Sequence, residues 1–600
     1  MTEKAPDPSL QPPPARGEMT PSSIEEPKMQ AATKDVESQP APSQDSYPPI
    51  RVVVPIMITL YCGLFLVALD RTILATAIPI ITDEFHSLGD VGWYGSAYML
   101  TACATQLVVG RLYTFYNQKT VYLVSLFLFE VGSAVCGTAP NSVAFIIGRA
   151  IAGLGSAGMF IGSVLLMIPI VPLRKRPVLQ GIAGSIFGIS SVVGPLLGGA
   201  FTDHVTWRWC FYINLPVGGI QAIVVLFTIK QTAPPSNAAL GLKSKLIQLD
   251  PLGNLFFVPG IVCLLLALQW GGSTYAWSNA RIIALLVLAI ILVAAFIVVQ
   301  VWNRDNTATV PLRVIKQRTV AGAFWFTFCT SAAMLAMVYY LPIWFQAIKG
   351  VDAVSSGLML LPLILGLVVA SIISGILVSR LGYYTPNLLA CSIIAPIGAG
   401  LLTTLKTTSG RSEWIGYQVI FGMGLGLGMM QANMAVQCVL PKADIPIGTT
   451  INSFAQQLGG AVFVSVCQNI FANDLVRGVR RLAPGISPKA IVSTGATDLR
   501  NVLSADELSN VLNAYNGALV KAFIVALAMS CFSIFGSSVI EWKSVKKVKD
   551  EGAMKGVPPE RLGKETTGEV TEDKEGRVSS EAPTKNESDD HETEKRNESV

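Results

Sequence analysis

Two charged residues stand inside long apolar runs of the sequence, where a charge is costly. Asp70 lies near the end of the run 52–74, and Arg149 lies early in the run 142–169. Charged side chains within membrane-spanning helices usually face the protein interior, pair with another group and mark ion or substrate pathways. If the first run leads outward and the fourth inward, both residues fall in the outer half of a bilayer and can pair. The alternative is that Asp70 is a helix cap beside Arg71.

A cluster of small residues surrounds a proline in the stretch 188–199. Gly188, Gly194, Gly198 and Gly199 fall on close faces of a helix, and Pro195 lies among them. Proline removes one backbone hydrogen bond and bends a helix. Glycines let a neighbouring backbone approach closely. The pattern predicts either a specialised contact between moving parts or ordinary tight packing.

Amides take the place of charges in the later apolar runs. The candidate cavity residues are Gln431, Asn433, Asn452 and Gln456. Asn452 and Gln456 are four positions apart, so they share one face of a helix. Such amides can line a solute cavity, or they can bond one helix to another. The sequence leaves both alternatives open.

Catalytic and cofactor motifs are missing from the sequence. It has no phosphate-binding G-x-x-x-x-G-K-[ST] loop and no H-E-x-x-H motif, and its three histidines fall outside the apolar runs. Its ten cysteines all fall inside such runs, without a C-x-x-C pair. We therefore expect no enzyme activity, no cofactor, no metal site and no nucleic-acid partner.

The elements that carry these residues are expected to be membrane helices. Hydrophobic residues make up 51% of the chain and charged residues only 14%, and the mean hydropathy is +0.52. A run of about 20 apolar residues is long enough to cross a bilayer as a helix. We count fourteen such runs, which predict an all-α polytopic membrane protein: 52–74, 91–111, 119–139, 142–169, 178–201, 209–229, 251–270, 281–302, 319–341, 354–379, 385–405, 414–439, 447–471 and 518–541.

The fourteen runs divide into six, two and six. We expect an N-terminal half at 47–230, a linker with an inserted helix pair at 231–302, and a C-terminal half at 303–542 with an external loop at about 472–517. The polar tails 1–46 and 543–600 are expected to be disordered. Basic residues gather in the loops on the side of the termini, which predicts cytosolic termini. The bent 188–199 helix is expected to press against the other half.

Several motifs together resemble the major facilitator superfamily, and within it the fourteen-span drug:proton antiporters of the fungal toxin and multidrug efflux branch. The resemblance covers about residues 48–542. The loop after the second run departs from the family pattern at Thr114 and Asn117, where aspartate and glycine are usual. The motifs are Leu69–Ile73 with Ile78 and Pro79, a conformational loop motif with Gly110, Arg111 and Lys119, Arg149–Gly155, the antiporter motif Gly188–Gly199, and Trp207–Gly219.

The resemblance implies two six-helix halves with two inserted helices, and export of small amphipathic molecules in exchange for protons. The exported molecule would be a secondary metabolite, toxin or drug. Asp70 and Arg149 would serve proton coupling. A monomer in the plasma membrane is implied, with a vacuolar or vesicle membrane as the alternative. Other possible functions are a proton-coupled importer, such as a siderophore transporter, and a membrane sensor without transport.

Overall fold

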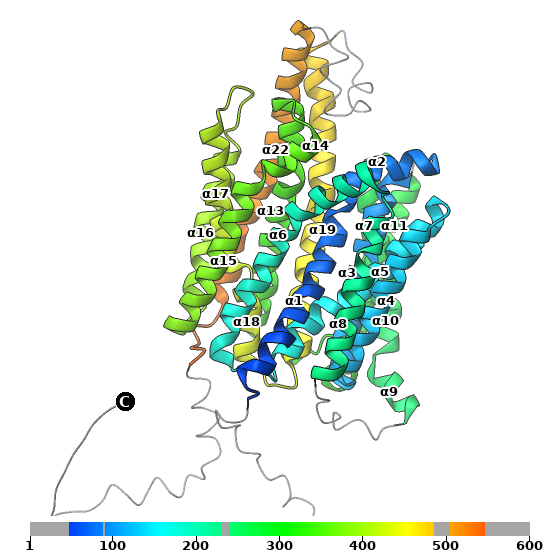
Figure 1. Cartoon of the computed structure of the whole chain (residues 1–600), viewed down its shortest axis with the longest axis vertical. Coiled ribbons are helices and arrows are strands. Elements are labelled where there is room, and N and C mark those ends of the chain that lie inside the picture. The colour runs from blue at the N-terminus through cyan, green and yellow to red at the C-terminus, as the bar shows by residue number, and fades with distance from the viewer. Residues whose placement is uncertain (1–46, 88–89, 230–240, 273, 485–504, 547–600) are drawn as a thin grey trace, which may run out of the picture. The chain divides into compact units, whose positions relative to one another are not determined.

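Helices make up nearly all of the structure. The computed structural model describes residues 47–87, 90–229, 241–272, 274–484 and 505–546, which belong to one unit of the chain, and it has no β-strand in them. A helix or a pair of helices occupies each of the fourteen expected ranges (Figure 1). By length and composition, twelve helices of this described part could cross a membrane. The all-α prediction is confirmed, whereas the number of spans by this measure is twelve.

The first part of the chain forms six helical stretches. The expected first run continues beyond residue 74, because Ile73 keeps near-helical dihedral angles and α2 follows it directly. Asp70 therefore precedes a bend and does not end the helical stretch. The helices are α1 (Ile50–Thr72), α2 (Leu74–Phe85), α3 (Val91–Phe115), α4 (Gln118–Thr138), α5 (Ser142–Met167), α6 (Arg176–His204), α7 (Trp209–Tyr212) and α8 (Asn214–Thr228).

The inserted segment is α9 (Leu242–Gln248), α10 (Pro251–Trp270) and α11 (Ala280–Thr307). Asp250 connects the start of α10 to the end of α11 through its side chain. The carboxylate of Asp250 is 1% exposed and accepts hydrogen bonds from Gln300 Nε2 at 2.6 Å, Asn303 Nδ2 at 3.1 Å and Thr309 Oγ1 at 2.9 Å. It also accepts from the backbone N–H of Gly253 at the start of α10. One buried carboxylate thus ties the start of α10 to the end of α11.

The last part repeats the six-stretch pattern. Its helices are α12 (Leu312–Ile315), α13 (Arg318–Trp344), the π-helical turn η4 (Phe345–Lys349), α14 (Ala353–Leu358), α15 (Leu361–Leu381), α16 (Thr385–Leu402), α17 (Arg411–Gly428), α18 (Gln431–Val439), α19 (Ile445–Leu482) and α22 (Ala505–Val539). Two pairs of helices bring the halves together, α3 beside α19 and α6 beside α15. The inserted α10 packs on both members of the first pair, and the rings of Phe257 and Phe454 lie 5.4 Å apart there.

The segment expected as an external loop at 472–517 is helical in α19 up to Leu482 and in α22 from Ala505, and its part 485–504 lies outside the described residues. The helices α19 and α22 both extend beyond their neighbours at the top of Figure 1. Leu475, Val479 and Val511 are almost fully buried along this extension, so the two helices pack on each other. Arg477 lies on the exposed side. Basic residues on one face made this stretch look like a loop, but its other face is apolar.

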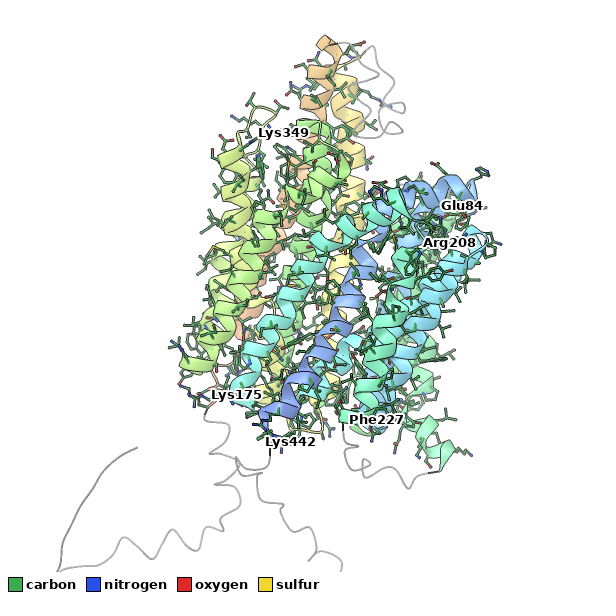
Figure 2. All side chains as sticks on the ribbon, viewed as in Figure 1. Glu84, Lys175, Arg208, Phe227, Lys349 and Lys442 are labelled. Atoms are coloured by element: carbon green, nitrogen blue, oxygen red, sulfur yellow. The ribbon has the colours of Figure 1, made fainter. Side chains whose placement is uncertain are left out.

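Loops that the sequence assigned to opposite sides of the membrane lie at opposite ends of the helices. Figure 2 shows Lys175 and Lys442 at one end, and Glu84, Arg208 and Lys349 toward the other. The expected tails fall mostly outside the described residues. The start of the second tail is an exception, because Val545 is 3% exposed and donates its backbone N–H to the Gly382 carbonyl at 2.8 Å. The ordered part therefore extends beyond residue 542.

Candidate functional site

Asp70 and Arg149 form a buried ion pair between α1 and α5. Arg149 Nη1 donates to Asp70 Oδ2 at 2.6 Å, and each side chain is at most 1% exposed. Arg149 Nε also donates to the Tyr94 carbonyl at 2.9 Å, and the guanidinium lies 4.6 Å from the centre of the Tyr98 ring. The predicted pairing is confirmed. The helix-cap alternative is wrong, because the carboxylate bonds to α5 instead of its own backbone.

The local sequence explains how this pair becomes buried. A Cβ atom at Gly153 would overlap with the Tyr98 carbonyl of α3, and one at Gly155 would overlap with the Phe129 backbone of α4. These glycines let α5 lie very close to two helices at once. The guanidinium that precedes them by one turn is thereby enclosed. The second carboxylate oxygen, Asp70 Oδ1, is buried without a hydrogen-bond partner.

Arg71 is a further charged residue of this site, although the sequence indicates it only as a neighbour of Asp70. Its Nη1 donates to Gln457 Oε1 of α19 at 3.1 Å, and its guanidinium lies 5.2 Å from the centre of the Tyr98 ring. Tyr98 therefore contacts two guanidinium groups, those of Arg71 and Arg149. Such cation–π contacts are strongest where water is excluded. The site links the first half to α19 of the second half.

The antiporter-motif glycines contact two different neighbours. A Cβ at Gly188 would come within 2.9 Å of Val368 on α15. By contrast, a Cβ at Gly194 would overlap with Thr72, and one at Gly198 would overlap with Thr76. The stretch therefore contacts the other half closely at Gly188, whereas Gly194 and Gly198 meet their own half.

Gly194 and Gly198 instead pack against the α1–α2 bend of their own half. Thr72 Oγ1 donates to the Ser190 carbonyl of α6 at 2.9 Å, which fixes this contact. The outer part of α6 meets α14 more loosely. Pro195 lies opposite Gly357, and Gly199 lies opposite Val354 at ordinary contact distances.

The residues of the conformational loop motif contact three different neighbours. A Cβ at Gly110 would overlap with Thr450 of α19, so α3 and α19 approach closely there. Arg111 is 4% exposed and donates from Nη2 to the Gln248 carbonyl at the end of α9, at 3.1 Å. Thr114, which stands where the family has an aspartate, donates its hydroxyl to the Gly110 carbonyl at 3.0 Å. The inserted segment thus supplies the partner of Arg111.

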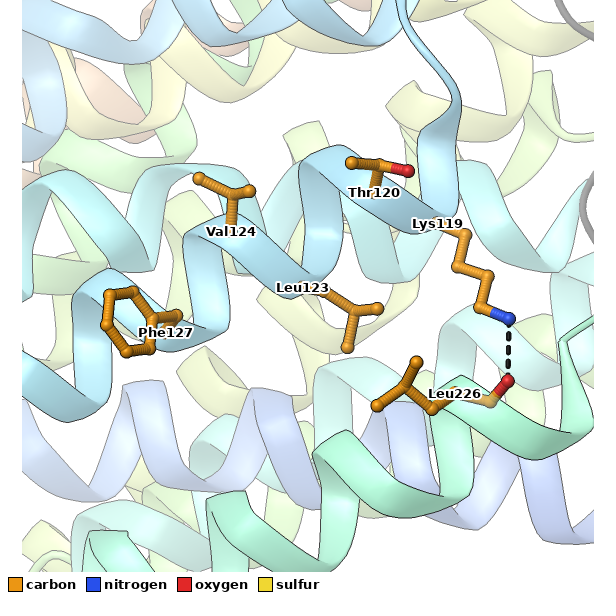
Figure 3. A pocket seen from close by; sticks show the side chains of 6 residues that line it. All are labelled: Lys119, Thr120, Leu123, Val124, Phe127 and Leu226. Carbon is orange, nitrogen blue, oxygen red and sulfur yellow. Dashed lines mark hydrogen bonds between the residues drawn. The ribbon is translucent and has the colours of Figure 1, made fainter.

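Lys119 has a separate role at the edge of α4. Figure 3 shows its ammonium group directed at the Leu226 carbonyl near the end of α8, at 2.6 Å. A cation at this position stabilises the carbonyl end of a helix. The hollow beside it is shallow and mostly apolar, with the exposed rings and methyls of Phe127 and Val124 on its wall. Asn117 caps α4 by accepting from the Lys119 backbone N–H at 2.9 Å.

Two of the four candidate amides bond to each other. Asn452 Nδ2 donates to Asn433 Oδ1 at 2.7 Å, and Asn452 Oδ1 accepts from Thr327 Oγ1 at 2.8 Å. These bonds join α18, α19 and α13. Gln431 is 1% exposed and its Oε1 is without a partner, while Gln456 is half-buried and contributes its backbone carbonyl to Ser331. The geometry favours the interhelical alternative for Asn433 and Asn452.

The comparison with protein families decides the identity of this fold. Residues 60–464 match the family described as the Major Facilitator Superfamily. The chain belongs to this superfamily. Solved structures agree with the fold: the proton:xylose symporter XylE bound to 6-bromo-6-deoxy-D-glucose aligns with a TM-score of 0.54 at 12% identity, over 84% of this chain and 99% of that one.

Close relatives within the Major Facilitator Superfamily are fungal efflux pumps. The MFS-type efflux pump MFS1 of Trichophyton rubrum is 52% identical over 499 residues, which is 83% of this chain and 93% of the relative. The efflux pump aflT of Aspergillus parasiticus is 52% identical, over 82% of this chain and 96% of the relative. The rubrofusarin-specific efflux pump aurT of Gibberella zeae is 50% identical, over 84% and 92%. This superfamily member is a multi-pass membrane transporter and not an enzyme.

Proposed function

We propose that this transporter exports small amphipathic molecules from the cytosol in exchange for protons that move inward. The names of its relatives support export, because they describe efflux pumps and, for aurT, a pump specific for rubrofusarin. We assign a secondary metabolite, toxin or drug as the exported molecule. In this proposal the transporter acts as a monomer in the plasma membrane, with both termini in the cytosol. Its first half ends at residue 230, the linker and inserted helix pair end at residue 302, and its second half ends at residue 542.

We further propose that the transporter has fourteen spans. The helices α3 and α19 would add to the twelve that meet the criteria of length and composition. Both carry polar side chains that point into the protein. Gln106 on α3 is 1% exposed and Asn452 on α19 is 2% exposed. Polar groups that face the protein interior lower the mean hydropathy of a helix although they do not contact lipid. This accounts for the absence of α3 and α19 from the twelve helices that meet the criteria.

The buried pair of Asp70 and Arg149 is the observation that carries the proton-coupling proposal. A proton on Asp70 would cancel the charge that holds Arg149 and would weaken a bond that now joins α1 to α5. Arg71, which contacts the same Tyr98 ring as Arg149, already links this site to α19. Protonation would thus change the contacts at the point where the two halves meet. Alternating access requires such a rearrangement between the halves.

The remaining motif residues have supporting positions in this proposal. Gly110 would allow the close α3–α19 contact, Arg111 would tie α3 to the inserted α9, and Lys119 would fix α4 to α8. Gly188, Gly194, Pro195, Gly198 and Gly199 would keep α6 close to its neighbours while the halves rock. Gln431 and Gln456 would remain as cavity residues, whereas Asn433 and Asn452 would join helices.

Inside-out membrane vesicles test the direction of transport. A fluorescent amphiphile is added outside vesicles whose interior is made acidic, and uptake of the dye is followed over time. We expect the acidic interior to drive uptake, because protons leaving the vesicle correspond to protons entering the cell. Uptake that required acid outside would mean that solute and proton move together, and would contradict export by antiport.

Variants of the pair test the coupling. Arg149→Ala, normalised to the amount of protein in the membrane, should lose proton-driven uptake. Arg281→Ala is the matched control, because Arg281 lies on the surface and bonds only locally to the hydroxyl of Tyr275. Asp70→Asn should keep some downhill exchange but flatten the pH dependence of uptake. A native pH profile in Asp70→Asn would remove Asp70 from the coupling mechanism.

A further inference from the structure

Glu130 is a carboxyl group inside α4 that the proposed mechanism does not use. It stands in an apolar stretch of a helix that is long enough to cross the membrane. Both of its carboxyl oxygens are buried, and neither has a hydrogen-bond partner among the described residues. The side chain lies against Gly218 of α8, where an added Cβ would overlap with its carboxyl group. Only a glycine at position 218 leaves room for this carboxyl group between the two helices.

The surface of α8 that faces Glu130 presents further oxygen atoms. Asn214 and Gln221 flank Gly218 at helical spacing, so the three residues share one face. Asn214 Nδ2 donates to Ser133 Oγ at 3.0 Å, and Gln221 Nε2 donates to the hydroxyl of Tyr122. Each bond uses one N–H of an amide, while Asn214 Oδ1 and Gln221 Oε1 stay buried without a donor among the described residues. Glu130 therefore lies beside buried oxygens that, like its own, accept no hydrogen bond.

The cations near α4 already have other partners. Arg149 on α5 pairs with Asp70 on α1. Arg208, which precedes α7, donates to Glu84 Oε1 at 2.9 Å and to the carbonyls of Gly137 and Ala139. Helix α8 contributes no titratable side chain to this contact. The other titratable groups here are phenols and thiols, Tyr122 and Cys136 on α4 itself and Tyr212 and Cys210 on α7.

We propose that Glu130 carries a proton in this conformation and is a second proton-binding site of the N-terminal half, separate from Asp70. An ionised carboxylate at this place would be buried without a cation or a donor, which is strongly unfavourable. A neutral carboxyl group avoids this cost, and it is itself a donor on a helix surface where buried oxygens have none. Release of this proton would require α4 and α8 to separate until water or a cation reaches Glu130.

This inference rests on the proposed proton-coupled transport for its functional meaning, but its first test does not. Infrared spectra of the purified, full-length protein at neutral pH report the C=O stretch of protonated carboxyl groups. We expect one such band to be missing in Glu130→Gln. Glu84→Gln is the matched control, since Glu84 is an exposed carboxylate paired with Arg208, and it should leave the band unchanged. A spectrum of Glu130→Gln with the full wild-type band would overturn the proposal.

The second test measures transport. In inside-out vesicles, the slope of log initial rate against pH should fall by about one in Glu130→Gln, because one titrating proton is lost. Glu130→Asp keeps a carboxyl group and should restore the slope, which separates proton binding from packing. An unchanged slope in Glu130→Gln would overturn the role in transport. If the infrared band is missing in Glu130→Gln but the wild type shows no proton-driven uptake, the proton stays assigned to Glu130. That result would reject the proposed transport function instead.

Discussion

Removing both partners of the Asp70–Arg149 pair should destabilise the protein by less than the sum of the two single removals. In Arg149→Ala, Asp70 stays buried and loses the one hydrogen-bond partner that it has among the described residues, because its other oxygen has none there. Breaking a buried ion pair in this way costs about 3–5 kcal/mol. Asp70→Asn should cost somewhat less, about 2–3 kcal/mol, because the guanidinium keeps the Tyr94 carbonyl and the faces of Tyr98 and Phe211.

The double variant Asp70→Asn/Arg149→Ala contains neither charge. Its destabilisation should therefore be smaller than the sum of the two single effects by about 2–3 kcal/mol, the upper range of couplings between residues in contact. The assay is thermal unfolding followed by tryptophan fluorescence in detergent, at one fixed heating rate because unfolding of such proteins is often irreversible. For a protein of this size, 1 kcal/mol corresponds to roughly 2 °C or less in Tm.

Additive effects would refute this reasoning. If the double variant loses as much Tm as the two single variants together, the two residues do not compensate each other's charge. A wild-type Tm in Arg149→Ala would be equally damaging, because it would mean that an isolated carboxylate can stay at this place without cost. Arg281→Ala provides the baseline for loss of a surface arginine, and its Tm should match the wild type within about 1 °C.

Three further predictions concern other parts of the structure. Gly198→Val should lower stability by about 1–3 kcal/mol through overlap at the α1–α2 bend, whereas Gly199→Val, which faces only Val354 at 3.8 Å, should be nearly neutral in Tm. Asp250→Asn should cost about 1.5–3 kcal/mol, because it weakens charge-assisted hydrogen bonds to α10 and α11, and limited proteolysis should cleave 241–250 faster. Burial disfavours the charge of Glu541, but hydrogen bonds from basic neighbours, led by Arg318, outweigh it and lower its pKa. The ionised Glu541 carboxylate therefore contributes to folding stability above the usual glutamate pKa, and this contribution is lost as the pH falls through the lowered pKa. Arg318→Ala should flatten the dependence of Tm on pH in that acidic range.

Charges inside apolar runs were the most informative feature of the sequence. Asp70 and Arg149 could be paired in advance, because the direction and rise of two helices give their depths. Arg71 was missed, although it is just as conspicuous, because its partner Gln457 lies nearly four hundred positions later and no local pattern indicates it. Glu130 was missed for a different reason. It is a single acidic residue in an apolar run, and that signal was present in the sequence.

Spacing predicted which glycines share a helix face but not which helix they meet. Gly188 and Gly194 belong to one motif, yet they contact α15 and the α1–α2 bend respectively. Such neighbours depend on how helices distant in sequence pack. The extension of α19 was missed because hydropathy averages over both faces of a helix. Leu475 and Val479 are buried there while Arg477 is exposed.

The inserted helices make the two sides of this transporter unequal toward the surrounding lipid. The halves meet along two lines, α3 with α19 and α6 with α15, and α10 covers the first of them. The described helices include no comparable cover on the second. Lipid beside the first line therefore meets α10, whereas lipid beside the second line would meet α6 and α15 themselves, where Gly188 approaches Val368.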